Sequence, residues 1–286
     1  MVRKNTGLAI DIQGVNVVAA GHAILRDIRL SISPGEHIAI VGPSGAGKSS
    51  LLGLLLGWHQ AVGGSVFVDR EPLSGERLLQ LRRETAWVDP AIQIWNRSLL
   101  ENLRYSSTAG PYSALGQILE SADLAKVLVR LPEGLQSSLG EGGARLSGGE
   151  GQRARLARAM WQQGVRLALL DEPFRGLDRE QRHRHLTEAR RFWQEATLIC
   201  VTHDVWETRS FNQVVVIESG HIVEDGRPAE LAAASSSRYR ALLDIEESLR
   251  QGLWGAPLWR RIRLDGGRVQ EATRVFLTTK RAASHE

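Results

Sequence analysis

A glycine-rich loop between two apolar runs is the first feature that could do chemistry. It reads GPSGAGKSS, follows Ile38–Val41 and precedes Leu51–Leu56. This order predicts a buried strand, a phosphate-binding turn and the start of a helix. Glycines let backbone N–H groups close around phosphate oxygens at the positive end of the helix dipole. The expected nucleotide-binding residues are Gly42, Pro43, Ser44, Gly45, Ala46, Gly47, Lys48, Ser49 and Ser50.

Charged side chains within and beyond this loop suggest the chemistry. Lys48 offers a mobile charge to the β- and γ-phosphates, and Ser49 offers a hydroxyl to Mg²⁺. Asp171 and Glu172 follow the apolar run LALL, which predicts a strand covered on both faces and hence a largely parallel sheet. Functional residues of such sheets lie at the carboxyl ends of the strands. There Asp171 can bind Mg²⁺, and Glu172 can orient and deprotonate an attacking water.

A histidine follows another predicted buried strand. His203 comes after Leu198-Ile199-Cys200-Val201-Thr202. A single histidine after a strand is usually structural, but here the strand belongs to the same predicted sheet. At that edge His203 can contact the γ-phosphate.

A second glycine-rich loop opens a helix of its own. It reads LSGGE, comprises Leu146, Ser147, Gly148, Gly149 and Glu150, and begins 98 residues after Lys48 (48 to 146). A helix N-terminus of this kind binds anions. Only one such terminus is needed for the nucleotide that the chain holds itself. The second is therefore predicted to serve the nucleotide of a second copy.

Five motifs in this order resemble the nucleotide-binding domain of an ATP-binding cassette (ABC) transporter, and the resemblance runs from about Leu8 to about Leu243. The motifs are the Walker A loop GPSGAGKS, the signature LSGGE, the Walker B segment LALLDE, the D-loop GLD that ends at Asp178, and the switch histidine His203. The resemblance implies an α/β fold: a P-loop NTPase core with a mostly parallel central sheet, an N-terminal antiparallel β subdomain and an inserted α-helical signature subdomain.

The resemblance also implies how the chain works. In that family two cassettes pair head to tail, and ATP with Mg²⁺ lies between one Walker A loop and the partner's signature. Ser147, Gly148 and Gly149 would then face a γ-phosphate held by the other subunit, and Asp178 would communicate across the dimer. Glu172, His203 and Lys48 would carry hydrolysis. All three are present, so we expect an active ATPase.

Finer similarities favour an exporter over an importer. LPEG at Leu131–Gly134 and LGEGG at Leu139–Gly143 precede the signature, as in exporter-type cassettes. There the second stretch contacts the intracellular loops of a permease. The expected partners are a second cassette, identical or different, and a transmembrane permease that is separate or fused. A free-standing regulatory cassette is the alternative, because it needs no further motif.

Two positions depart from the family pattern. Where exporter cassettes usually carry a glutamine, this chain has Pro90, whose side chain cannot contact Mg²⁺ or water. Gln93 could substitute through a shifted loop, although an ordinary surface residue is the simpler interpretation. The family also stacks an aromatic ring on adenine, but Val17–His22 contains no Phe, Tyr or Trp. His22 could stack more weakly or could be a solvated turn residue, and weak base discrimination is expected.

Length and composition indicate one cassette and a basic extension. We expect the cassette at residues 8–245, with its helical subdomain at about 90–160. Residues 250–286 form a basic, Trp-containing extension with a predicted hairpin, either packed on the cassette or contacting anionic lipid or the permease. The single Cys200 cannot form an internal disulfide, which suits the cytosol.

The sequence also indicates a location. No apolar run approaches the roughly 18 residues that span a bilayer, and no secretory leader is apparent. The expected location is therefore the cytoplasmic face of the membrane, held there through a permease. Arg153, Arg155 and Arg158 follow the signature. We interpret them as a solvated face or structural ion pairs, and we expect no nucleic-acid partner.

Overall fold

The computed structural model describes residues 6–105, 109–255, 262–265 and 268–271, with side chains described through Leu249. Contacts divide the chain into two compact units, Met1–Leu243 and Asp244–Glu286. Along the described part of the chain, no helix has both the length and the apolar character needed to cross a membrane.

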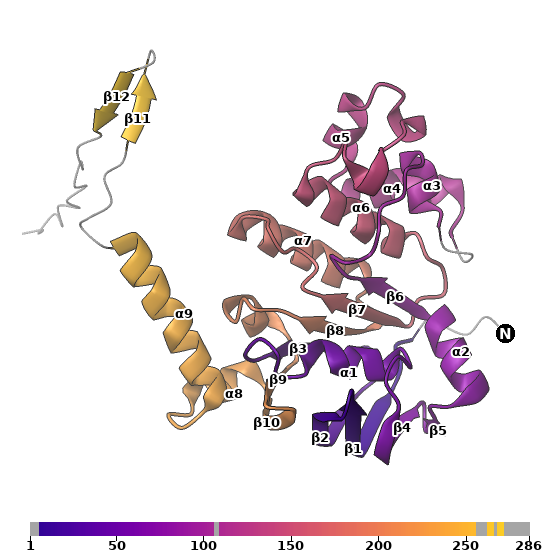
Figure 1. The fold of residues 1–286 in the computed structure, drawn as a ribbon, viewed down its shortest axis with the longest axis vertical. Coiled ribbons are helices and arrows are strands. Elements are labelled where there is room, and N and C mark those ends of the chain that lie inside the picture. Colours follow the sequence, from indigo (N-terminus) through magenta and orange to yellow (C-terminus); the bar gives the residue numbers. More distant parts are fainter. Residues whose placement is uncertain (1–5, 106–108, 256–261, 266–267, 272–286) are drawn as a thin grey trace, which may run out of the picture. The chain divides into compact units, whose positions relative to one another are not determined.

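A six-stranded sheet forms the centre of the first unit. Its order is β10-β9-β3-β8-β7-β6, and every neighbouring pair is parallel except β9 and β10 (Figure 1). The strands are β3 (His37–Val41), β6 (Thr85–Val88), β7 (Leu167–Asp171), β8 (Thr197–Val201), β9 (Gln213–Glu218) and β10 (His221–Gly226). The mostly parallel central sheet predicted from the sequence is confirmed.

Successive residues of these strands enter two different hydrophobic cores. In β7, Leu167 and Leu169 join one core, while Ala168 and Leu170 join the other. This alternation follows from the two-residue period of a strand, and it explains why the strand sequences are apolar throughout. The first core contains α1 (Lys48–Leu55), and the second contains α7 (Arg179–Phe192).

An antiparallel sheet packs against the first core. Its order is β2-β1-β4-β5, from β1 (Ile10–Ala19), β2 (His22–Ile32), β4 (Ala61–Val68) and β5 (Glu71–Pro72). Ala20 and Gly21 connect β1 to β2 with positive φ angles of 49° and 79°. Two positive φ angles in a two-residue connection match the twist of a tight hairpin. This sheet is the predicted N-terminal antiparallel subdomain.

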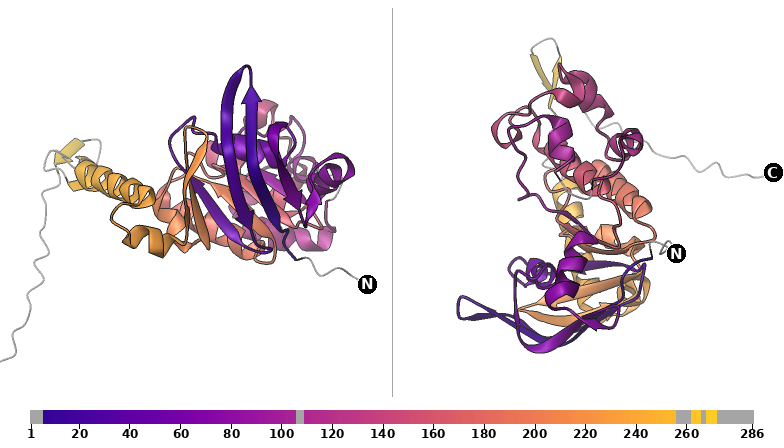
Figure 2. Two further views of the ribbon diagram at one scale, coloured as in Figure 1. Left: turned by 90° about the horizontal axis from the view of Figure 1, so that it is seen from below. Right: turned by 90° about the vertical axis from the view of Figure 1, so that its right-hand side faces the viewer.

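Helices between β6 and β7 form a separate region that shares the second core. They are α3 (Leu99–Leu103), α4 (Leu115–Ser121), α5 (Ala125–Arg130) and α6 (Gly148–Met160). Figure 2 shows this helical region and the antiparallel sheet at opposite ends of the first unit. The chain thus leaves the α/β core after β6 and returns at β7, as the predicted insertion requires.

The remaining α-helices and strands are α2 (Gly75–Arg83), α8 (Pro228–Ala233), α9 (Arg238–Gly255), β11 (Ile262–Asp265) and β12 (Arg268–Glu271). In the second unit, β11 and β12 pair antiparallel in the segment for which the sequence predicts a hairpin. The described residues do not include residues 266–267 between these two strands, Trp259, or residues 272–286.

Candidate functional site

The glycine-rich loop joins the end of β3 to the start of α1. Its path depends on close approach, because a Cβ atom at Gly47 would lie 2.8 Å from the carbonyl oxygen of Ile24 in β2. Gly47 also has φ 105°, a conformation that side chains disfavour. No side chain among the described residues caps α1. Its first N–H groups therefore remain available to an anion, as the motif predicts.

Lys48 is buried beneath this loop. Its Nζ donates to the carbonyl oxygens of Gly42 at 2.9 Å and Pro43 at 2.8 Å. Burial lowers the pKa of Lys48, while the nearby carboxylates of Glu172 and Asp171 raise it in part. A lysine in this setting gains from a phosphate, because the added negative charge offsets the cost of burying its ammonium group.

Asp171 ends β7 beside the first turn of α1. Its carboxylate is hydrogen-bonded by the Ser49 side chain, so the two predicted metal ligands lie together. Burial raises the pKa of Asp171, and the neighbouring acids Asp89 and Glu172 add to the effect. A cation would relieve this concentration of negative charge. Oxygen ligands from one carboxylate and one hydroxyl suit Mg²⁺, which normally completes its shell with phosphates and water.

Glu172 faces His203 across the ends of β7 and β8. His203 Nε2 lies 2.6 Å from Glu172 Oε1, and the backbone N–H of Glu172 donates to the carbonyl oxygen of Val201 at 3.0 Å. Glu172 has φ 43°, an uncommon conformation for a residue with a side chain. Such strain is typical of functional positions that their surroundings hold in place. The base and the histidine predicted from separate segments are thus direct neighbours.

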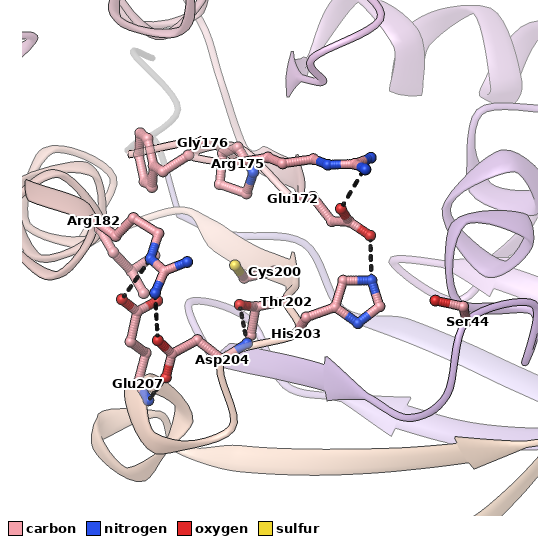
Figure 3. A pocket seen from close by; sticks show the side chains of 13 residues that line it. Ser44, Glu172, Arg175, Gly176, Arg182, Cys200, Thr202, His203, Asp204 and Glu207 are labelled. Atoms are coloured by element: carbon pink, nitrogen blue, oxygen red, sulfur yellow. Dashed lines mark hydrogen bonds and ion pairs between the residues drawn. The ribbon is translucent and has the colours of Figure 1, made fainter. Parts of the chain in front are cut away.

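A pocket of about 390 Å³ opens beside this pair (Figure 3). Ser44 of the glycine-rich loop lies on one side, and the segments after β7 and β8 form the rest of the wall. The lining residues are Ser44, Glu172, Pro173, Phe174, Arg175, Gly176, Arg182, Leu186, Cys200, Thr202, His203, Asp204 and Glu207. Phosphate-loop, acidic and histidine residues therefore converge from three separate segments of one chain.

The signature loop begins α6 with a reciprocal cap. Ser147 accepts a hydrogen bond from the N–H of Glu150, and the Glu150 carboxylate accepts one from the N–H of Ser147. Glu150 also pairs with Arg130 at 2.6 Å. Burial opposes ionisation of Glu150, but the Ser147 and Arg130 contacts outweigh it, so its pKa is lowered. Leu146 precedes the cap and packs against the second core.

The two signature glycines have different surroundings. A Cβ at Gly148 would meet no atom within 4 Å, whereas one at Gly149 would lie 2.4 Å from Leu177 Cδ2. Gly148 thus borders open space, and Gly149 permits α6 to pack on the D-loop of the same chain. Asp178, next to Leu177, caps α7 by accepting a hydrogen bond from the N–H of Gln181 at 2.9 Å.

Gln93 and His22, the two candidate substitutes for missing family residues, are both exposed. Gln93 has an exposed side chain, and its backbone oxygen accepts a hydrogen bond from Arg158 at 3.2 Å. His22 begins β2 at the hairpin turn, also exposed. Within the described residues, neither lines the pocket beside Glu172. Their contribution to nucleotide binding remains a prediction.

Arginines of α6 hold the loop that contains Gln93. Arg155 donates to the carbonyl oxygen of Ile92 in this loop, and Arg158 donates to that of Gln93 at 3.2 Å and to that of Asn102 in α3 at 2.7 Å. Burial lowers the pKa of Arg158 to about 10. The interpretation of these residues as a solvated face is therefore wrong, because their guanidinium groups bind carbonyls. Arg153 does form an ion pair, with Asp123 at 3.4 Å.

Several residues near the pocket were missed from the sequence. Arg175 lies 3.9 Å from the Glu172 carboxylate, and Arg182 pairs with Asp204 at 3.0 Å. Arg175 lies between the Walker B segment and the D-loop, and this position is the one signal that could have drawn attention to it. Arg182 and Asp204 lie 22 residues apart in no common motif. Only the position of Asp204, next to the predicted histidine, could have suggested it.

This fold and this site define a P-loop ATPase with a signature helix. The family model for ABC transporters matches residues 25–175. The ATP-dependent lipid A-core flippase of Acinetobacter baylyi is 35% identical over 210 residues, covering 72% of this chain and 36% of the relative. The glutathione/L-cysteine transport system ATP-binding/permease protein CydC of Escherichia coli is 36% identical over 216 residues, covering 76% of this chain and 37% of the relative.

Structural similarity agrees with these matches. A bacterial Atm1-family ABC exporter solved with ATP bound shares the fold with a TM-score of 0.79 at 24% identity, covering 86% of this chain and 43% of that one. The chain belongs to the ABC transporter family and is an ATP-hydrolysing nucleotide-binding domain of the exporter type. It spans about a third of the length of these curated relatives. The relatives do not favour the regulatory alternative.

Proposed function

We propose that this chain is the motor domain of an exporter, in which two cassettes pair head to tail around two ATP molecules. The observation that carries this proposal is the separation of two phosphate-binding features within one chain. Ser44, Glu172 and His203 line one pocket, whereas Ser147 and Gly148 are not among its lining residues in the described part of the chain. A signature that does not reach its own pocket can serve the pocket of a partner.

In the proposed reaction, this chain's residues divide the work. Glu172 orients a water molecule and accepts its proton as the water attacks the γ-phosphate. His203, 2.6 Å from Glu172, holds that carboxylate and steadies the γ-phosphate. Lys48 and the N–H groups at the start of α1 stabilise the charge that develops on the phosphoryl oxygens. Arg175 provides a further positive charge near Glu172.

Mg²⁺ fits the pair formed by Ser49 and Asp171, which would hold it. The ion would neutralise phosphate charge and orient the oxygens of the triphosphate. In the partner's site, the uncrowded N-terminus of α6 at Gly148 would receive the γ-phosphate. ATP then joins the two cassettes, and hydrolysis releases them.

The proposed setting is the cytoplasmic face of a membrane, with the cassette attached to a permease. Support comes from relatives that are named as a flippase and as an ATP-binding/permease protein, each about three times as long as the matched segment. The permease is either fused to this chain or a separate subunit. The basic extension after residue 250 is proposed to pack on the cassette or to contact lipid or the permease.

A complementation experiment tests the head-to-tail pairing. Lys48→Ala disables the phosphate loop, and Gly148→Asp places a carboxylate at the signature, where an added Cβ atom borders open space. Each variant alone should lose most of its ATPase activity. An equimolar mixture should recover about a quarter of the wild-type rate, because half of randomly formed dimers are mixed and each contains one intact site. A mixture with no recovery would contradict pairing between two copies of this chain.

A further inference from the structure

The switch histidine is not held in place by packing around its own ring. The side chain of His203 is 47% exposed, and its contact with Glu172 joins two side chains that must both remain correctly placed. The backbone next to His203 is better fixed. The N–H of Asp204 donates to Thr202 Oγ1 at 3.1 Å, and the Asp204 side chain is only 8% exposed.

The Asp204 carboxylate connects this segment to α7. Its Oδ2 accepts a hydrogen bond from Arg182 at 3.0 Å, and Arg182 Nε also lies 3.9 Å from the carboxylate of Glu207, whose side chain is 5% exposed. Asp204 Oδ1 accepts a hydrogen bond from the N–H of Glu207 at 3.3 Å. Figure 3 shows this cluster on one side of the pocket and the His203–Glu172 pair on the other, with Thr202 between them.

An aromatic contact joins the same two segments at a second point. Trp206, in the short 3₁₀ helix Trp206–Ser210, has the guanidinium of Arg179 at 5.5 Å and that of Arg209 at 4.4 Å from its ring centroid. Arg179 is the first residue of α7, directly after the D-loop residue Asp178. Cation–π contacts of this kind favour one relative placement of the two segments.

We propose that Arg182 and Asp204 are positioning residues for ATP hydrolysis, which hold His203 against Glu172 by fixing the switch segment to the first turns of α7. Neither is assigned a contact with ATP. The inference rests on the proposed roles of Glu172 and His203. It also places the D-loop cap Asp178 and the switch histidine at two ends of one connected unit.

The test uses substitutions that separate charge from local structure. Arg182→Gln and Asp204→Asn each remove the ion pair, while asparagine keeps the ability to bond the N–H of residue 207. Each should lower kcat for ATP about tenfold and change KM less than about twofold, since a small displacement of a catalytic group mainly slows chemistry. The double variant should be no slower than either single variant, because both remove one interaction.

Two further comparisons distinguish positioning from general destabilisation. In a His203→Ala background, Arg182→Gln should have no additional effect on kcat. Arg191→Gln is the matched control, since this arginine is also on α7, is 78% exposed and, within the described residues, forms its ion pair with Glu188 of the same helix at 3.6 Å. The Arg191→Gln variant should leave kcat unchanged. An equal loss of kcat from Arg182→Gln with or without His203 would overturn the proposal.

Amide hydrogen exchange of residues 202–206 supplies a measurement that does not depend on turnover. In the nucleotide-free chain, Arg182→Gln should accelerate this exchange about fivefold or more, and Arg191→Gln should not. Unchanged exchange together with unchanged kcat would refute the positioning role while leaving the ATPase assignment intact. Accelerated exchange in a chain whose wild type fails to hydrolyse ATP would refute the catalytic roles of Glu172 and His203 instead.

Discussion

The phosphate-loop edge of the sheet and the signature end of α6 both present helix N-termini to an anion, but they are built differently. At the first, no described side chain caps α1, and Asp171, Glu172 and His203 from the ends of β7 and β8 lie near Lys48 at its start. At the second, Ser147 and Glu150 cap α6 reciprocally, and Gly148 leaves open space. The first region contains groups able to transfer protons and bind metal, whereas the second contains groups suited to recognition.

The difference explains why one chain carries both. The chemical groups need fixed mutual distances, which strands of one sheet provide at their carboxyl ends. A recognition surface for a partner's nucleotide needs only a shaped helix N-terminus that is free of its own ligand. Loss of a proton-transfer group in the first region should therefore abolish chemistry and spare assembly, and changes between the regions should affect their cooperation.

The largest expected effect follows from removing the base. Glu172→Gln retains the shape of the side chain but cannot accept a proton, so kcat should fall about 100- to 1,000-fold while ATP binding persists. Assembly should be preserved, and light scattering should then detect an ATP-bound dimer that does not dissociate. Glu180→Gln, at an exposed position in the first turn of α7, is the control and should behave as wild type. Hydrolysis by Glu172→Gln at the wild-type rate would show that another group is the base.

A buried histidine lies at the contact between the two regions. His185 of α7 packs against Phe174, which lines the pocket beside Glu172 and His203, with ring centroids 5.6 Å apart. Its Nε2 has no hydrogen-bond partner among the described residues. Four charged side chains influence the imidazole: the cations Arg184 and Arg153, and the acids Asp123 and Asp178. Arg153 belongs to the signature helix, and Asp123 lies between α4 and α5.

This histidine predicts a pH dependence of stability. Burial, and next the charges of Arg184 and Arg153, lower the pKa of His185 from 6.5 to about 4. The unfolded chain therefore binds a proton between these values while the folded chain does not. Stability from this group is complete above pH 6.5 and decreases as the pH falls toward 4, by roughly 2 kcal/mol at pH 5.

Urea unfolding at pH 7.5 and pH 5 measures this effect. His185→Phe keeps a ring against Phe174 and cannot be protonated, so it should lose roughly 2 kcal/mol less stability than wild type between the two pH values. His185→Gln should show the same reduced dependence despite different packing. His183→Gln changes an exposed histidine on the same helix and should match wild type. Identical pH dependence in all four proteins would mean that His185 is protonated equally in both states.

What could be predicted from the sequence depended on whether a signal was local. The strand at Leu167–Asp171 and the mostly parallel sheet are confirmed, because an unbroken apolar run has few alternatives in an α/β fold. Ser49 and Asp171 were proposed as metal ligands from separate motifs, and they do lie together. Each motif follows the carboxyl end of a strand, and parallel strands place their carboxyl ends at the same edge of the sheet.

Contacts between segments without motifs could not be predicted. Arg182 and Asp204 form an ion pair because α7 packs beside the segment after β8. No spacing in the sequence predicts this contact. The arginines of α6 gave a misleading signal, since a series of cations usually indicates a solvated face. In the structure Arg155 and Arg158 bind the carbonyl oxygens of Ile92 and Gln93, in a loop more than 40 residues earlier, which only tertiary packing determines.

The smallest expected effect concerns Gln93, which lies between the two regions in sequence but has an exposed side chain. Its backbone oxygen accepts a hydrogen bond from Arg158 at 3.2 Å. Gln93→Ala should therefore change kcat less than about twofold, whereas Arg158→Met should cost about 1–3 kcal/mol of stability by leaving carbonyls of the loop without a donor. Steady-state ATPase rates and urea unfolding of both variants measure the contrast. A tenfold loss of kcat in Gln93→Ala at unchanged stability would instead show that its side chain substitutes for the glutamine that Pro90 replaces. The loop would then be part of the catalytic region rather than of its supporting structure.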